Sequence, residues 1–168
     1  VYPSTAMDEN SGEVTFELDA EQSVAPGTFP SGLNLSSARV SFEALEVAGT
    51  ANATFLNAFS IIRFTLPADV KALKITGTEN LAGKAEFKFV DQDEQPWSSR
   101  LVADNFVSES KSVTLTPSEA TAFVAGETYN ILVYPGTHSE ITVELTDTDD
   151  CTYSNTVTKE FVFEAAKH

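Results

Sequence analysis

Short runs of alternating apolar and polar residues, separated by turns rich in proline and glycine, constrain the fold of this chain more than any other feature. EVTFEL (13–18) and KAEFKFV (84–90) each place three apolar side chains on one face. These are Val14, Phe16, Leu18, Ala85, Phe87 and Phe89. A period of two residues indicates a strand with one buried face. Helical periodicity is scarce, so we predict an all-β protein with at most one or two short helical turns.

Longer apolar segments extend this prediction. ATFLNAFSIIRFTL (53–66) is apolar on both faces, which predicts a central strand covered on both sides and bulged near Ser60. ETYNILVYPG (127–136) predicts a strand ending at a Pro-Gly turn, and residues 140–165 predict two or three more strands. Short strands separated by such turns favour an antiparallel β-sandwich.

Three further segments complete the prediction along the chain. Residues 19–37 are rich in proline, glycine, serine and asparagine and are expected to form a loop or linker. Residues 38–47 favour a strand over a helix, and residues 91–100 are expected to form a polar connection.

Composition excludes several classes of protein. The chain has 168 residues, enough for one well-packed domain or one domain and part of another. Its 25 acidic and 10 basic residues give a net charge of -15, which would repel a nucleic-acid backbone. No apolar run approaches the length of a transmembrane helix. The first residues do not resemble a signal peptide, so if the protein is exported its targeting segment is absent from this chain.

Residues with metal-binding or catalytic chemistry are sparse. Cys151 is the single cysteine, which excludes an intramolecular disulfide and leaves its role open. Of the two histidines, His168 is the last residue and His138 lies in a THSE segment that predicts an exposed turn. The chain contains no GxSxG, P-loop or GxGxxG motif. We therefore predict a protein without enzymatic activity and without a cofactor.

Two loops remain candidate binding sites. TDTDDCTYS (146–154) brings together Asp147, Asp149 and Asp150, which are weak candidates for a calcium site or, alternatively, the residues of a tight hairpin turn. Trp97 follows Pro96 in the polar connection. An exposed tryptophan there could stack on a sugar, whereas a tryptophan folded back would cover the core.

Several segments together resemble one family. They are FLNAFSIIRFTLPADVKALKITGTENLAG (55–83), GETYNILVYPGTHSEITVELTDTDDCTYSNTVTK (126–159), LDAEQSVAPGTF (18–29), the initial VYP and the final FEAAKH. In this pattern the chain is similar to the fimbrillin-like domains of surface lipoproteins and pilus subunits of gut and oral Gram-negative anaerobes. One departure is Asp150, where the family usually has glycine in the hairpin.

The resemblance implies a fold and a location. It implies antiparallel, Greek-key, transthyretin-like β-sandwich domains on the cell surface, at the outer membrane, and it carries over no active-site residue. Residues 1–36 are expected to be the end of a preceding β-domain or a linker strand, and residues 37–168 the fimbrillin-like sandwich. The chain starts directly on VYP and stops after FEAAKH, so neighbouring strand segments of the family are expected to be absent from this polypeptide.

The function expected from this resemblance is that of an adhesin or a pilus (fimbrial) subunit. Such a domain would bind other pilus or surface-protein subunits by strand addition at a sheet edge, and host proteins or glycans are further expected partners. The alternative is a carbohydrate-binding surface module that uses Trp97 and the acidic loops.

Overall fold

The computed structural model describes residues 3–8, 11, 13–38, 55–66, 70–92 and 95–165. Strands make up 62% of the structure, and the described residues contain no α-helix. The elements in chain order are η1 (Ser4–Ala6), β1 (Val14–Leu18), β2 (Glu21–Val24), β3 (Ser36–Ser37), β4 (Leu56–Asn57), β5 (Ser60–Thr65), β6 (Val70–Gly77), β7 (Gly83–Gln92), β8 (Gln95–Phe106), β9 (Ser112–Pro117), β10 (Thr128–Val133), β11 (Gly136–Asp147) and β12 (Thr152–Phe163). The prediction of an all-β protein is confirmed.

The largest sheet has five strands in the order β12-β11-β6-β9-β2. Its pairs are antiparallel except for β2 and β9, which run parallel. β11 and β12 form one long hairpin, and the register shifts between His138 and Glu140. The hairpin places β12 at the edge of the sheet, with nearly all of its residues exposed.

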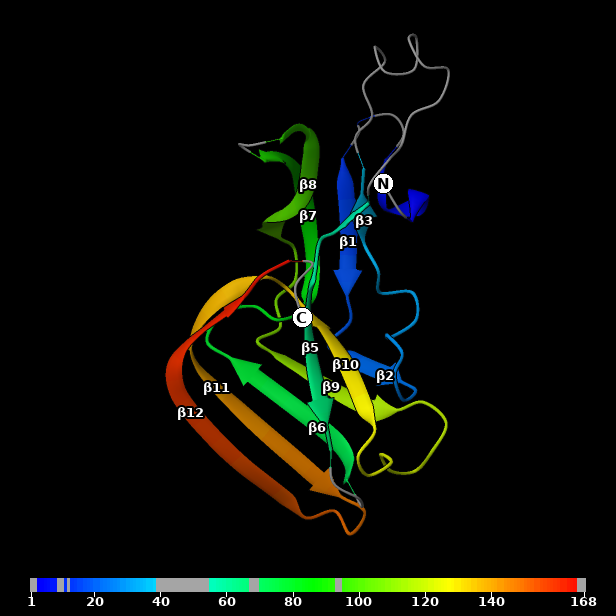
Figure 1. The fold of residues 1–168 in the computed structure, drawn as a ribbon. Helices are drawn as coiled ribbons and strands as arrows, with labels where there is room; N and C mark the ends of the chain where they lie inside the picture. Colours follow the sequence, from blue (N-terminus) through cyan, green and yellow to red (C-terminus); the bar gives the residue numbers. More distant parts are fainter. Residues whose placement is uncertain are drawn as a thin grey trace.

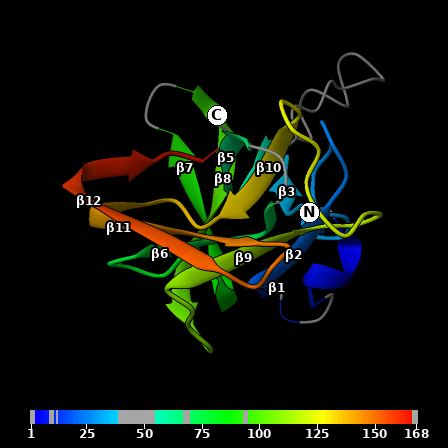
Figure 2. The same cartoon turned by 90° about the horizontal axis from the view of Figure 1, so that it is seen from below.

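Three smaller sheets complete the fold. β1, β7 and β8 form an antiparallel sheet, β10 pairs with β5, and β3 pairs with β4. The strands β5 and β10 lie over one face of the five-stranded sheet in both views, while β7 and β8 extend away from it (Figures 1 and 2). No helix among the described residues is long and apolar enough to cross a membrane.

A continuous hydrophobic core joins these sheets. Leu73 and Ile75 of β6 are almost completely buried. Aromatic rings fill the junction between the sheets, where Phe59 lies 5.4 Å from the ring of Tyr134 and 5.7 Å from that of Phe16. Tyr134 also contacts Phe106, with ring centroids 4.9 Å apart. Burial of such side chains contributes roughly 1.5–3 kcal/mol each to stability.

Several predicted boundaries differ from the structure. Residues 19–37 are not only a loop, because β2 lies within them and pairs with β9. The predicted polar connection at 91–100 is wrong for residues 91–92, which end β7, and for residues 95–100, which begin β8. Residues 39–54, which include most of the predicted strand 38–47, lie outside the described residues. Polar strand residues resemble loops in sequence when only one face of the strand is covered.

The hairpin of β7 and β8 explains a further difference. Ala85 and Phe87 are buried as predicted, but Phe89 is 47% exposed. The hairpin therefore extends past the core that its first residues cover. The N-terminal strand β1 pairs with β7, so strands from both sides of the predicted boundary at residue 36 share a sheet. The domain division itself stays a prediction.

Candidate functional site

Among the described residues, the strand β5 is paired along one edge only. Ser60–Thr65 pairs residue by residue with Thr128–Val133 of β10. Along its other edge, no strand in the described part of the chain pairs with it. The prediction of a central strand is therefore wrong for residues 55–66, which form a short β4, two bend residues and a β5 that lies at the edge of its sheet among the described strands. An edge of this kind can bind another strand through its backbone N–H and C=O groups.

A cleft lies along this unpaired edge. It is lined by residues 60–63 of β5 and by residues 162–164 at the end of β12, and its volume is about 450 Å³. We call it the β5–β12 groove. One wall of the groove is the edge of the β5–β10 sheet, and the other is the edge of the five-stranded sheet. At this place no described strand bridges the two sheets.

The groove continues into an apolar hollow of about 230 Å³ that shares Ile62 and Phe163 with it. Phe64 of β5 forms one wall of the hollow. Side chains from the five-stranded sheet form the rest: Ile75, Ile141, Val143, Val157, Phe161 and Phe163. Val157 is 41% exposed, so part of this hydrophobic surface is in contact with water. Apolar surface that is open to solvent commonly marks a binding site.

Ser60 adds a polar group to the groove. Its side chain is almost completely buried, and its Oγ has no hydrogen-bond partner in the described structure. A buried hydroxyl without a partner costs free energy that a bound ligand could recover. Next along the edge, Arg63 donates from Nε to Oδ1 of Asn130 at 3.4 Å, which holds its stem along the β5–β10 pair.

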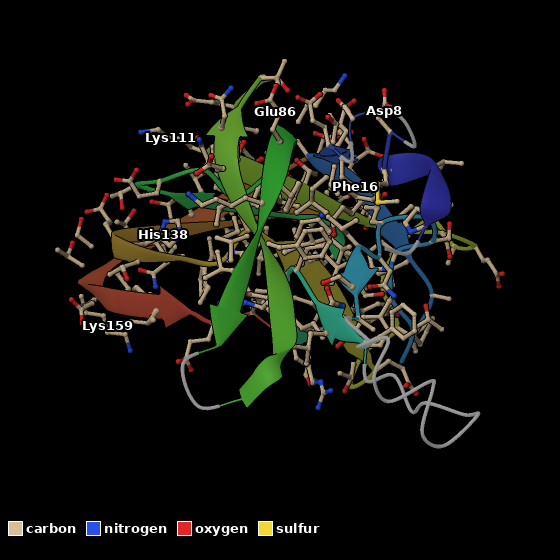
Figure 3. All side chains as sticks on the ribbon, turned by 90° about the horizontal axis from the view of Figure 1, so that it is seen from above. Asp8, Phe16, Glu86, Lys111, His138 and Lys159 are labelled. Carbon is tan, nitrogen blue, oxygen red and sulfur yellow. The ribbon has the colours of Figure 1, made fainter. Side chains whose placement is uncertain are left out.

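His138 lies at the β11–β12 end of the molecule, with Lys111 and Lys159 on either side of it in Figure 3. The prediction that it is exposed in a turn is wrong, because it belongs to β11 and its side chain is fully buried. Its ring lies 5.1 Å from that of Phe163, which lines the groove. Burial lowers the pKa of His138, and the charge of Glu79 partly offsets this effect.

The acidic loop is a self-contained turn. Oδ1 of Asp147 accepts hydrogen bonds from the backbone N–H groups of Asp149 and Cys151, both at 2.9 Å. Asp150 pairs with Lys71 and adopts a φ of 67°, in the left-handed region. Asp150 therefore adopts a backbone conformation that glycine adopts more readily than other residues. The described residues contain no group of three or more acidic, histidine or cysteine side chains placed to hold a metal.

The second predicted site residue, Trp97, lies on β8 rather than in a loop. Its side chain lies outside the part that the structure describes, so its role in sugar binding stays a prediction. The structure does not place the acidic turn in the groove, whose lining contains none of Asp147, Asp149 and Asp150.

The groove lacks an activated nucleophile among its described residues. A serine nucleophile requires a base within hydrogen-bonding distance. Ser60 has no such partner, and Nδ1 of His138 already accepts a hydrogen bond from the backbone N–H of Glu79. The arrangement is suited instead to binding an extended chain through backbone hydrogen bonds and apolar side chains.

A scan against models of protein families finds no match, and searches of curated proteins and of solved structures find none either. Strand addition at a sheet edge was expected from the resemblance, but the sequence did not locate that edge at β5, because an apolar strand has the same pattern whether its edges are paired or free.

Proposed function

We propose that this chain is a non-enzymatic surface domain of the fimbrillin-like kind, which binds a strand from another subunit in the β5–β12 groove. Its role would be that of an adhesin or pilus subunit outside the cell, attached at the outer membrane. The observation that carries the proposal is the unpaired edge of β5 beside an apolar hollow. An added strand would pair with β5 and insert alternate side chains into the hollow.

The proposal includes an antiparallel, Greek-key, transthyretin-like β-sandwich. Two observations support it. The strands β5 and β10 lie over one face of the five-stranded sheet, and side chains from both sheets belong to one buried cluster. In such a sandwich, the strand that is missing beside β5 would cover the inner face of the β11–β12 hairpin.

A strand supplied in cis tests the groove. We would fuse a flexible linker and ten residues of alternating valine and threonine to the C-terminus, and compare it with the same fusion carrying proline at alternate positions. Proline cannot donate the backbone hydrogen bonds that strand addition requires. We expect the first fusion to gain ~2 kcal/mol and therefore to raise the Tm by roughly 4–8 °C.

Two variants make this test specific to the groove. Ile62→Glu puts a charge into the hollow and is expected to abolish the gain. Val107→Glu makes the same chemical change at an exposed position outside the groove and is expected to leave the gain intact. Equal Tm values for the two fusions in the unsubstituted protein would overturn the proposed binding mode.

A further inference from the structure

The surroundings of His138 fix its neutral form. The backbone N–H of Glu79 donates to Nδ1 at 3.2 Å, so Nδ1 carries no proton and the ring proton lies on Nε2. Nε2 is itself buried and has no hydrogen-bond partner in the described structure. A second proton would have to be placed on Nδ1, directly opposite the N–H of Glu79. Protonation would thus replace a hydrogen bond with a repulsive contact and leave a cation in a buried site.

Close packing leaves the ring no room to turn away. A side chain at Gly77 would overlap Nδ1, so β6 contacts the ring through bare backbone. A Cβ at Gly136 would lie 3.6 Å from Nε2. On the remaining side the ring contacts Phe163. The charged ring could gain a hydrogen-bond partner only by leaving this slot.

The charges around the slot do not reverse this preference. On the β6–β7 turn, Glu79 favours the protonated ring, but burial is the larger effect on the pKa. At this end of the sheet the other charged groups are Lys111, whose Nζ donates to the carbonyl of Thr78, Glu140, which accepts from Thr158, Lys159, which lies over the ring of Phe161, and Glu160 and Glu164 of the β12 segment. Lys71 and Lys74 of β6 and Glu144 and Asp147 of β11 lie towards the other end of these strands, where Lys71 pairs with Asp150 and Lys74 with Glu144. The folded state therefore favours the neutral imidazole of His138.

We propose that His138 is a pH-dependent lock, and that its protonation releases the end of β12 from β11. The segment that would be released begins at Phe161, which is opposite His138, and includes Phe163, which is opposite Gly136. Both phenylalanines line the apolar hollow, and Phe163 also lines the groove. Mild acid would then widen the groove, and this last step rests on the proposed function.

Hydrogen exchange resolved by residue tests the lock in the chain without any added strand. We would compare the amides of residues 136–138 and 161–163 at pH 7.5 and pH 5.0, after correction for intrinsic exchange rates. We expect at least tenfold faster exchange at pH 5.0 in these two segments. Residues 144–146 and 152–154, at the other end of the same hairpin, serve as the internal control.

Two variants assign the effect to one histidine. His138→Gln can accept the same hydrogen bond from Glu79 but cannot titrate, so its protection should be the same at both pH values. His168→Gln removes the other histidine of the chain and should keep the acid response. The same acid response in His138→Gln, or none in the unsubstituted protein, would overturn the lock.

A direct titration covers the case in which His138→Gln does not fold. The C2 proton of the His138 ring, followed by NMR in the His168→Gln protein, should titrate below the ordinary value of ~6.5. A midpoint at or above that value would also refute the proposal. Neither of these two experiments contains a donor strand. A negative result for the lock therefore says nothing against strand binding in the fusion test at pH 7.5. A negative result in the fusion test likewise says nothing against the lock.

Discussion

The side chain of Gln22 hydrogen-bonds both backbone groups of Leu132, 110 residues away in the sequence. Nε2 donates to the carbonyl of Leu132 at 2.7 Å, and the N–H of Leu132 donates to Oε1 at 3.0 Å. The amide thus takes the place of a neighbouring peptide group and ties β2 of the five-stranded sheet to β10 of the opposite layer. Gln22 is almost completely buried.

Replacing Gln22 by leucine should therefore be costly. The substitution keeps the volume but leaves the N–H and C=O of Leu132 without these partners, so we expect the free energy of unfolding to fall by about 2–4 kcal/mol. Urea denaturation measures this change. Ser23→Ala, at the exposed neighbouring position, should change the value by less than ~0.5 kcal/mol. A Gln22→Leu protein as stable as Ser23→Ala would show that water replaces the amide.

The contact between Gly77 and His138 predicts a coupled pair. Gly77→Ala places a methyl group against the buried imidazole and should destabilise the protein by ~1–3 kcal/mol. Adding the same change to His138→Ala should cost much less, because the space is then empty. A double-mutant cycle measures the coupling. Gly126→Ala is the control, since its φ of +80° causes backbone strain that His138→Ala cannot relieve. Additive effects for Gly77 and His138 would contradict the packing described here.

The buried phenol of Tyr134 predicts sensitivity to alkaline pH. Burial, with a smaller effect from Glu17, raises the pKa of Tyr134 above its ordinary value near 10. The neutral phenol of Tyr134 therefore contributes its full stabilisation of the folded state below about pH 10. This contribution is lost as the pH rises towards the higher pKa of Tyr134 in the folded protein. Tyr134→Phe should flatten this alkaline decrease in stability. At pH 7 it should cost ~1 kcal/mol, because the hydroxyl donates to the carbonyl of Gly83 at 3.1 Å.

Stability at pH 7 and at pH 10–11, measured by urea denaturation, checks both parts of this prediction. Tyr153→Phe, at a phenol that is 61% exposed, controls for loss of a tyrosine hydroxyl at pH 7. An unchanged alkaline slope in Tyr134→Phe would assign the effect to other groups.

The acidic turn predicts independence from calcium. Because Oδ1 of Asp147 already binds two backbone N–H groups, thermal melts with calcium and with a chelator should superpose. Asp147→Ala should lower stability by ~1–2 kcal/mol through loss of these bonds, whereas Asp149→Ala should have a small effect. If calcium raised the Tm of the unsubstituted protein but not that of Asp147→Ala, the result would support a calcium site at this turn.

Local patterns predicted much of the strand content. Alternation identified β1 and the buried Ala85 and Phe87 of β7, and the Pro-Gly pair marked the end of β10. These predictions succeeded because a period of two residues depends only on which face of one strand is buried. The same reasoning did not identify β2, whose buried residues include the polar Gln22, since its burial depends on a partner 110 residues away.

The sequence by itself determined that this chain forms strands, and it determined the buried face of several of them, such as β1 and the first residues of β7. Only the tertiary structure decided which edges are paired. β5 and β6 are both apolar, yet β6 lies between β11 and β9 while β5 is paired on one side only in the part of the chain that the structure describes. His138 likewise became a buried group through Gly77 and Phe163, which adjoin it in space but lie far from it along the chain. Local periodicity indicates which face of a strand is buried, whereas the pairing of its edges and the burial of a polar side chain depend on residues that are distant along the chain.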